Sequence, residues 1–302
     1  MAKSKGVVGI IGLGIMGGSF ARNLVKSGWR VVGYDISPAR RKELSQAGVK
    51  IADGIPELAA AVPVIITSLP KPEALAAVAH AIADAKLPKK IIAECSTFTI
   101  EDKEGAEAVL RKSGHTLLDC PVSGTGSQAR TGDLVIYASG DTKAIARLKP
   151  MFAGYSRKTY DVGTFGNGSK MKYVANLLVA INNVATAEAM VLGMKAGLDP
   201  QVIFEMIQNG AGNSRVFELR APMMVKNDYS SDVTMKCSIW QKDMDVIGGY
   251  AKKLRVSTPL FSATRPVYHA AIKAGHGEED TAAVCAVLEA KAAVKRKAKR
   301  RR

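Results

Sequence analysis

Short apolar runs alternate with amphipathic stretches along the first half of the chain. The runs predict strands at residues 7–11, 30–34, 64–68, 90–94, 116–119, 134–138 and 158–162. Between most of them, apolar residues recur at helical spacing, which predicts helices at 15–27, 38–46, 72–83 and 100–112. Alternating strands and helices favour a parallel, doubly wound sheet. We therefore predict an α/β domain over residues 1–165.

The second half of the chain has a different pattern. From about residue 166 the β-branched runs give way to segments rich in Ala, Met and Leu, which predict helices at 170–196, 200–210, 235–253, 259–274 and 281–292. Turn and capping signals separate these segments, as at Leu198-Asp199-Pro200. We predict an all-α C-terminal domain over residues 166–290.

Composition agrees with two globular domains and excludes several other classes. The chain has 302 residues, of which 47% are hydrophobic and 23% charged. Its four cysteines lack metal-ligand or redox spacing. The N-terminus carries no signal peptide, and we see no apolar run of the roughly 18 to 20 residues that a membrane span requires. These features predict a cytoplasmic protein with reduced thiols and no membrane association.

The positive charge is unevenly distributed. Of the net charge of +16, eight charges lie in residues 291–302, which contain no acidic residue. The remaining body is moderately basic, as expected for an enzyme of anionic substrates and cofactors. We predict that residues 291–302 form a disordered, solvated tail. Contact with nucleic acid is the alternative and is the less favoured interpretation.

A glycine motif follows the first predicted strand and opens the first helix. It comprises Gly12, Leu13, Gly14, Ile15, Met16 and Gly17. The first glycine permits a tight turn, the second lets the backbone approach a pyrophosphate, and the third lets helix pack on strand. The helix N-terminus presents N–H groups to the anion. The motif therefore predicts a Rossmann domain that binds a dinucleotide with these six residues.

The second strand ends at an acidic residue, Asp35. An acid about 20 residues beyond the first glycine typically bonds the adenosine ribose hydroxyls and repels a 2′-phosphate. We therefore predict NAD as the cofactor. Arg40 and Arg41 follow closely and leave NADP as the alternative. A solvent-exposed acid at a strand end is the other interpretation of Asp35.

Three further segments are expected near the cofactor and substrate. Two predicted strands end in Ser68-Leu69-Pro70 and Cys95-Ser96-Thr97, at the edge where open α/β sheets bind ligands. Such residues also form simple turns. The loop Pro121-Val122-Ser123-Gly124-Thr125-Gly126 offers N–H groups and the Ser123 hydroxyl, which suit a substrate carboxylate. A connecting turn is the alternative for this loop as well.

Lys172 and Asn176 lie four residues apart at the start of the longest predicted helix and so share a face. A lysine whose pKa is lowered by burial can take the proton of a substrate hydroxyl, and a nearby amide can hold the oxygen. A solvated helix lysine is the alternative. The four histidines form no cluster and no zinc spacing, so we predict no metal site.

Together these residues resemble the β-hydroxyacid dehydrogenase family, the group of 3-hydroxyisobutyrate dehydrogenase, tartronate semialdehyde reductase and L-threonate dehydrogenase. The resemblance covers residues 6 to about 290. It rests on four ordered motifs: residues 9–17, residues 121–124, the segment from Gly166 to Asn176, and Lys242-Asp243.

The resemblance implies NAD-dependent oxidation of the 3-hydroxyl of a small carboxylic acid. It implies that Lys172 is catalytic, that Asn176 positions the substrate, and that Ser123 and Gly124 bind its carboxylate. It also implies cofactor contacts from Leu69, Pro70, Thr97 and Lys242, and a homodimer or homotetramer packed through the helical domain. Thr125 stands where many members have a second glycine, which we expect to reshape the substrate loop.

Within the family, Asn213 and Ser214 resemble the substrate residues of the branch that acts on L-threonate, although both residue types also cap helices. A decarboxylating phosphogluconate enzyme shares the motifs but needs a larger helical domain. The alternative from another class is a non-catalytic dinucleotide-binding module whose basic tail binds nucleic acid.

Overall fold

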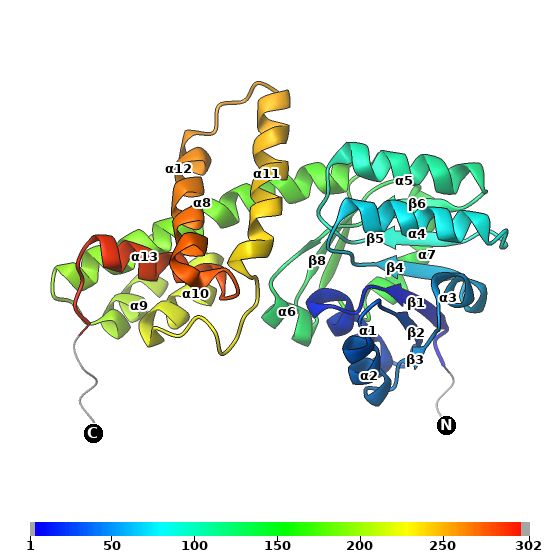
Figure 1. Cartoon of the computed structure of the whole chain (residues 1–302), viewed down its shortest axis with the longest axis horizontal. Coiled ribbons are helices and arrows are strands. Elements are labelled where there is room, and N and C mark those ends of the chain that lie inside the picture. The colour runs from blue at the N-terminus through cyan, green and yellow to red at the C-terminus, as the bar shows by residue number, and fades with distance from the viewer. Residues whose placement is uncertain (1–3, 297–302) are drawn as a thin grey trace. The chain divides into compact units, whose positions relative to one another are not determined.

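The computed structural model describes residues 4–296 (Figure 1). The chain divides into two compact units, Met1–Tyr173 and Val174–Arg302. The division falls within a long helix, α8 (Asn167–Lys195), a little later in the chain than the predicted boundary at residue 165.

A six-stranded parallel sheet forms the centre of the first unit. Its strand order is β3-β2-β1-β4-β5-β6, so the direction of strand addition reverses between β1 and β4. The strands are β1 (Val7–Ile11), β2 (Arg30–Tyr34), β3 (Lys50–Ile51), β4 (Val64–Thr67), β5 (Ile91–Glu94) and β6 (Thr116–Asp119). Ligands bind at such a reversal, beyond the carboxyl ends of the strands. The predicted doubly wound fold class is confirmed.

Helices cover both faces of this sheet, as a parallel sheet requires. One face packs against α1 (Ile15–Lys26), α2 (Pro38–Gln46) and α7 (Thr142–Phe152). The other face packs against α3 (Ile55–Ala61), α4 (Pro72–Asp84) and α5 (Ile100–Lys112). Alternate residues of β1 supply the two cores: Ile10 lies in the first and Ile11 in the second. Figure 1 shows α4 and α5 side by side over the second face.

A separate three-stranded sheet contains two strands that we expected in the main sheet. It pairs β7 (Val122–Ser123) antiparallel with β8 (Val135–Ala138), and β8 parallel with β9 (Lys158–Asp161). The short helix α6 (Gly126–Thr131) connects β7 to β8. Parallel neighbours need a crossover of a dozen or more residues. The connections from β6 to β7 and from β7 to β8 are shorter, and the prediction of one parallel sheet is wrong here.

The described part of the second unit contains helices and no strand, which confirms the predicted all-α half. After α8 come α9 (Pro200–Gln208), α10 (Arg215–Lys226), α11 (Cys237–Lys253), α12 (Pro259–Ala271) and α13 (Val284–Lys291). The sequence did not predict α10, which has Pro222 in its interior. Its N-cap is Ser214, whose Oγ accepts the Phe217 N–H at 3.0 Å.

By length and composition alone, α8 is the one helix in residues 4–296 that is long and apolar enough to span a membrane. It meets this test on its mean hydropathy, because polar residues such as Asn182 and Asn183 interrupt its apolar stretches. The helix carries buried polar groups that pair within the second unit, because Asn183 Nδ2 donates to Tyr268 Oη at 3.0 Å and to the Thr281 carbonyl at 2.9 Å. Ala180 and Ala187 are fully buried. We therefore interpret α8 as the core helix of this unit.

The predicted start of the disordered tail, at residue 291, is too early in the chain. Lys291 ends α13, and Arg296 donates to the Met224 carbonyl at 2.7 Å and pairs with Glu289. Glu289 is 9% exposed, and a buried carboxylate needs a partner. Residues 291–296 therefore pack on the helical unit, and residues 297–302 lie outside the described residues.

A buried ion pair joins distant segments of the helical unit. Arg220, on α10, pairs with Asp280, whose carboxylate also accepts the Thr234 N–H at 2.8 Å. The Arg220 and Asp280 side chains are 4% and 0% exposed. Removing one partner would leave the other charge buried without compensation.

We expect Arg220→Met to lower the free energy of unfolding by about 3–5 kcal/mol. Arg215→Met is the matched control, because the Arg215–Glu218 pair is solvent-exposed and its loss should leave stability almost unchanged. Urea denaturation followed by circular dichroism and tryptophan fluorescence measures both. Equal stability of the two variants would contradict the structural role of the buried pair.

Candidate active site

The glycine motif forms a tight turn between β1 and α1. Gly12 has φ +90°, and a Cβ there would lie 2.1 Å from the Ser68 carbonyl oxygen. A Cβ on Gly17 would lie 1.9 Å from the Gly12 carbonyl oxygen, whereas one on Gly14 would meet open space. The motif thus needs glycine for packing at its ends and leaves its centre accessible.

The start of α1 is suited to an anion. Gly14 is its N-cap and supplies no side-chain acceptor for the first N–H groups of the helix. Ile15 is 36% exposed, and Met16 packs against the first core. An accessible backbone and unsatisfied helix N–H groups fit a pyrophosphate.

Asp35 lies just beyond β2 and is fixed by backbone donors. Its Oδ2 accepts the Leu13 N–H at 2.7 Å, and its Oδ1 accepts the Ser37 N–H at 2.8 Å. Arg41 donates to the Asp35 carbonyl at 2.7 Å. Each carboxylate oxygen keeps acceptor capacity for a hydroxyl donor. The acid is thus tied to the glycine turn, which argues against the interpretation as a merely exposed strand end.

Arg40 is held away from a phosphate-binding role. Its guanidinium pairs with Glu43 at 2.8 Å, and Arg22 pairs with the same carboxylate at 2.9 Å. Hydrogen bonds from Arg40 and Arg22 lower the pKa of Glu43. Glu43 therefore stays ionised and competes with any phosphate for Arg40.

The ends of β4 and β5 are linked through Ser96. Its Oγ accepts the Leu69 N–H at 2.8 Å, and its own N–H donates to Glu94 at 2.9 Å. Leu69 and Thr97 are half-buried and Pro70 is exposed. Ser96 had no predicted role of its own, because a serine at a strand end often only forms a turn.

Ser123 and Gly124 follow β6 closely in the chain. Both are half-buried, and Gly124 has φ +142°. A Cβ on Gly124 would lie 2.4 Å from a Leu134 methyl group. The next residue, Thr125, is the N-cap of α6 and donates its N–H to Gln128 at 3.0 Å. Thr125 therefore starts a helix where a second glycine would leave a more open loop.

Lys172 lies in the second turn of α8 and is 8% exposed. Ser169, three residues earlier, donates its N–H to the Asp119 carboxylate at 2.7 Å. Tyr173 donates its hydroxyl to the Phe98 carbonyl at 2.5 Å. The start of α8 is thus fixed to the ends of β5 and β6. In contrast, Lys170 on the same helix is exposed.

Asn176 belongs to the second unit and is 4% exposed. Its Nδ2 donates to Asp243 Oδ2 at 3.0 Å, and Lys242 Nζ lies 3.3 Å from Asp243 Oδ1. Asp243 fixes the amide so that Asn176 Oδ1 is its remaining acceptor. Asp243 had no predicted role, although its place beside Lys242 in one of the four family motifs was an available signal.

Asn213 and Ser214 lie at the start of α10. Asn213 Nδ2 donates to the Gln208 carbonyl and to Glu218, both at 2.9 Å. The Ser214 hydroxyl caps the helix. The structure therefore shows the capping interaction that competed with the substrate interpretation, and a substrate role for these two residues stays a prediction.

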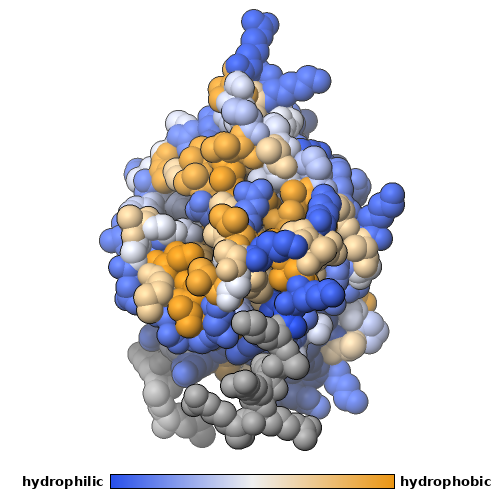
Figure 2. Space-filling model, turned by 90° about the vertical axis from the view of Figure 1, so that its left-hand side faces the viewer, coloured by the Kyte–Doolittle hydropathy of each residue, from blue (hydrophilic) through white to orange (hydrophobic). Residues whose placement is uncertain are grey.

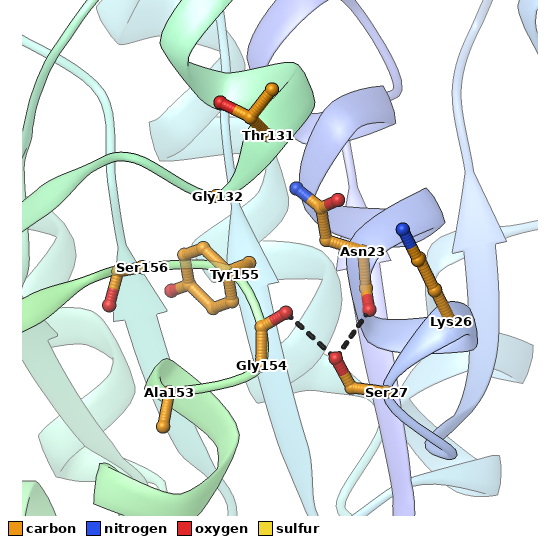
Figure 3. A pocket seen from close by; sticks show the side chains of 9 residues that line it. All are labelled: Asn23, Lys26, Ser27, Thr131, Gly132, Ala153, Gly154, Tyr155 and Ser156. Atoms are coloured by element: carbon orange, nitrogen blue, oxygen red, sulfur yellow. Dashed lines mark hydrogen bonds between the residues drawn. The ribbon is translucent and has the colours of Figure 1, made fainter.

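A cavity of about 340 Å³ lies at the C-terminal end of α1, away from the glycine motif. Figure 3 shows Ser27 donating to the carbonyl groups of Asn23 and Gly154 within it. Asn23 in turn donates to the Ala129 carbonyl at 2.7 Å. Because these polar groups bond to one another, we interpret the cavity as part of the packing of α1 against α6 and the residues after α7.

The described residues contain no group of three or more His, Cys, Asp or Glu side chains arranged for a metal ion. All four cysteines are free and buried. Burial raises the pKa of Cys237 and of Cys285 to about 12, so both thiols stay protonated near neutral pH. Protonated thiols are poor nucleophiles and poor metal ligands.

Comparison with known proteins matches both halves of the chain. Residues 7–163 match the family described as the NAD binding domain of 6-phosphogluconate dehydrogenase. Residues 166–288 match the family described as NAD-binding of NADP-dependent 3-hydroxyisobutyrate dehydrogenase.

Individual relatives match over nearly their whole length. L-threonate dehydrogenase of Cupriavidus necator is 32% identical over 93% of this chain and 95% of its own length. 3-Hydroxyisobutyrate dehydrogenase of Pseudomonas aeruginosa is also 32% identical, over 89% and 94%. A crystal structure of 3-hydroxyisobutyrate dehydrogenase from Salmonella typhimurium is 31% identical, covers 93% of this chain and 99% of its own, and gives a TM-score of 0.83.

The glycine turn, the fixed acid beyond β2 and the buried lysine on α8 agree with these matches. The chain therefore belongs to the 3-hydroxyisobutyrate dehydrogenase-like family of β-hydroxyacid dehydrogenases, NAD-binding enzymes that act on CH–OH groups.

Proposed function

We propose that this enzyme oxidises the 3-hydroxyl of a small hydroxy carboxylic acid, such as L-threonate, 3-hydroxyisobutyrate or glycerate, with Lys172 as the proton-transfer group. The buried position of Lys172 carries the proposal, because the sequence left a solvated helix lysine as its alternative. Lys172 is 8% exposed and lies on a turn fixed to the sheet edge by Asp119 and Ser169.

Bound NAD supplies the ring that accepts the hydride from the substrate carbon. Lys172 Nζ takes the proton of the substrate hydroxyl in oxidation and returns it when the reaction runs as a reduction. The Asn176 amide holds the substrate oxygen, with its Nδ2 anchored by Asp243. Burial of the lysine limits competition from water for the proton.

Ser123 and Gly124 are proposed to bind the substrate carboxylate. The backbone of Gly124 supports this role, because φ +142° and the close Leu134 methyl group require glycine there, and the loop then offers a backbone N–H next to the Ser123 hydroxyl. Asn213 and Ser214 are proposed to select polar four-carbon acids. Asn213 Oδ1 can accept a hydrogen bond from the substrate, and the Ser214 hydroxyl can donate one. Oxidation of only branched aliphatic acids would remove this part of the proposal.

For the cofactor, we propose that Gly12, Leu13, Gly14, Ile15, Met16 and Gly17 hold the pyrophosphate and that Asp35 receives the adenosine ribose hydroxyls. Leu69, Pro70, Thr97 and Lys242 complete the cofactor contacts. NAD is preferred, since Asp35 repels a 2′-phosphate and Glu43 occupies Arg40. NADP remains the weaker substrate.

We further propose a cytoplasmic enzyme that acts as a homodimer or homotetramer, without nucleic-acid or membrane partners. The four buried, unbridged cysteines support a reducing compartment. A non-catalytic binding module would not need a buried lysine beside the cofactor strands, which favours the enzyme.

Lys172→Ala should lower kcat by about 10²- to 10⁴-fold, because the variant lacks the group that transfers the proton. NAD binding should be retained. Nicotinamide absorbance over a panel of 3-hydroxy acids measures turnover, and Lys170→Ala on the same helix is the control that should keep the native rate. Full activity of Lys172→Ala would refute the proposed role.

Asp35→Asn should lower the ratio of the NAD to the NADP specificity constant by at least about tenfold, because it removes a like-charge repulsion of several kcal/mol. Asparagine keeps an acceptor for the Leu13 N–H. Initial rates with both cofactors at several concentrations give the ratio. A wild-type enzyme that strongly prefers NADP would overturn the cofactor assignment.

Figure 2 shows apolar side chains gathered on the exposed face of the helical unit. In and just before α9, Leu198, Val202 and Met206 recur every four residues and are 56%, 45% and 67% exposed. Exposed apolar patches mark association surfaces, and we assign this stripe to a second copy of the chain.

Light scattering should give a mass of at least twice that of one chain for the native protein. The variant Val202→Glu/Met206→Glu should form a smaller assembly, because it places charges on this stripe. A monomeric native protein would contradict this assignment.

A further inference from the structure

A buried cluster of three charges lies inside the first unit. Lys103 Nζ, on α5, lies 2.7 Å from Asp119 Oδ1 and 2.8 Å from Glu94 Oε2. All three side chains are fully buried. Glu94 is the last residue of β5 and Asp119 the last of β6, so the cluster lies at the edge of the sheet where its ligands bind.

Each carboxylate also holds a segment of the proposed active site. Glu94 accepts the Ser96 N–H at 2.9 Å, and Ser96 accepts the Leu69 N–H at 2.8 Å. This chain of bonds fixes the strand ends proposed to meet the cofactor.

Asp119 acts on the helix that carries Lys172. Its Oδ2 accepts the Ser169 N–H at 2.7 Å, and its Oδ1 accepts the Ser169 hydroxyl at 2.9 Å. Ser139 bridges the Asp119 carbonyl and the Gly168 N–H. The first turn of α8 is thereby attached to β6 at several points.

Stability alone does not explain these charges. Burying three ions costs several kcal/mol each, and well-packed apolar residues in their place are often equally stable or more so. Burial by itself would lower the pKa of Lys103, but the carboxylates of Asp119 and Glu94 outweigh burial and raise it. The ammonium therefore stays charged and lies within ion-pair distance of both carboxylates.

We propose that Lys103 is a positioning residue for the reaction: its ammonium locks Glu94 and Asp119 so that the cofactor strand ends and the first turn of α8 hold one fixed geometry. This inference rests on the proposed function of Lys172. This role requires no contact between Lys103 and the substrate. Its effect on catalysis runs through the two carboxylates and the backbone groups that they bind.

Lys103→Met should lower kcat by about 10- to 100-fold in folded protein, because displacement of a catalytic group by about 1 Å has an effect of this size. Two buried carboxylates would then repel each other until one takes up a proton. At higher pH neither carboxylate of the variant takes up a proton, so the repulsion is greatest. The ratio of variant to native kcat should therefore fall as pH rises. A purely structural lysine would give a ratio that does not depend on pH.

Besides the two carboxylates, the charge of Lys103 acts on the thiols of Cys95 and Cys120 and on the hydroxyl of Tyr173. Burial raises the pKa of all three groups. They remain uncharged between pH 6 and 9, roughly the range of the assay, and do not produce the expected pH dependence.

Lys103→Met/Glu94→Gln removes one of the two unpaired charges, and we expect it to recover part of the lost kcat and to lose the pH dependence. Glu94→Gln alone retains an acceptor for Ser96 and should lower kcat severalfold. If Lys103→Met does not fold, Glu94→Gln becomes the decisive variant. A native kcat for Glu94→Gln would then overturn the inference.

Lys90→Met is the matched control. Lys90 is 6% exposed, precedes β5 at the opposite edge of the sheet, and donates its ammonium to the Val62 carbonyl at 2.8 Å. Its loss should reduce the melting temperature while kcat stays native. Equal kcat losses in Lys90→Met and Lys103→Met, or native kcat in folded Lys103→Met, would overturn the inference.

Lys172→Ala, assayed beside these variants, separates the two proposals. Native activity of Lys172→Ala refutes the proposed function. An inactive Lys172→Ala together with a fully active Lys103→Met refutes only the positioning role.

Discussion

One buried carboxylate connects the sheet of the first unit to the helix that leaves it. Asp119 ends β6, accepts both the N–H and the hydroxyl of Ser169, and pairs with the ammonium of Lys103. A buried carboxylate is costly unless hydrogen bonds or opposite charges compensate for the loss of water. The need to satisfy this one group therefore sets where α8 begins, and with it the location of Lys172.

The cofactor end of the same sheet is organised by close backbone packing instead of charge. Any side chain at Gly12 or Gly17 would collide with a carbonyl oxygen about 2 Å away. Asp35 then draws the turn toward β2 by accepting the Leu13 N–H. Steric fit thus forms the turn, and a single carboxylate fixes it next to the residues proposed to read the ribose.

The helical unit uses the same principle of paired buried polar groups. Asp243 anchors Asn176, and Asp280 anchors Arg220. Each pair joins residues at least 60 positions apart in the chain. Buried polar contacts of this kind specify one arrangement of the helices, because a shifted arrangement would leave a charge or an amide unsatisfied.

The sequence by itself determined the doubly wound sheet, the helical second half and the glycine turn, because each depends on local periodicity or on residues adjacent in the chain. It also pointed to Lys172, through the resemblance to the β-hydroxyacid dehydrogenases, with the spacing from Asn176 in agreement. Only the tertiary structure decided that β8 and β9 form a separate sheet, that Ser214 caps α10, and that Lys103 joins Glu94 to Asp119. These features depend on which distant groups are buried together, and a linear pattern of hydrophobic and polar residues carries no information about such partners.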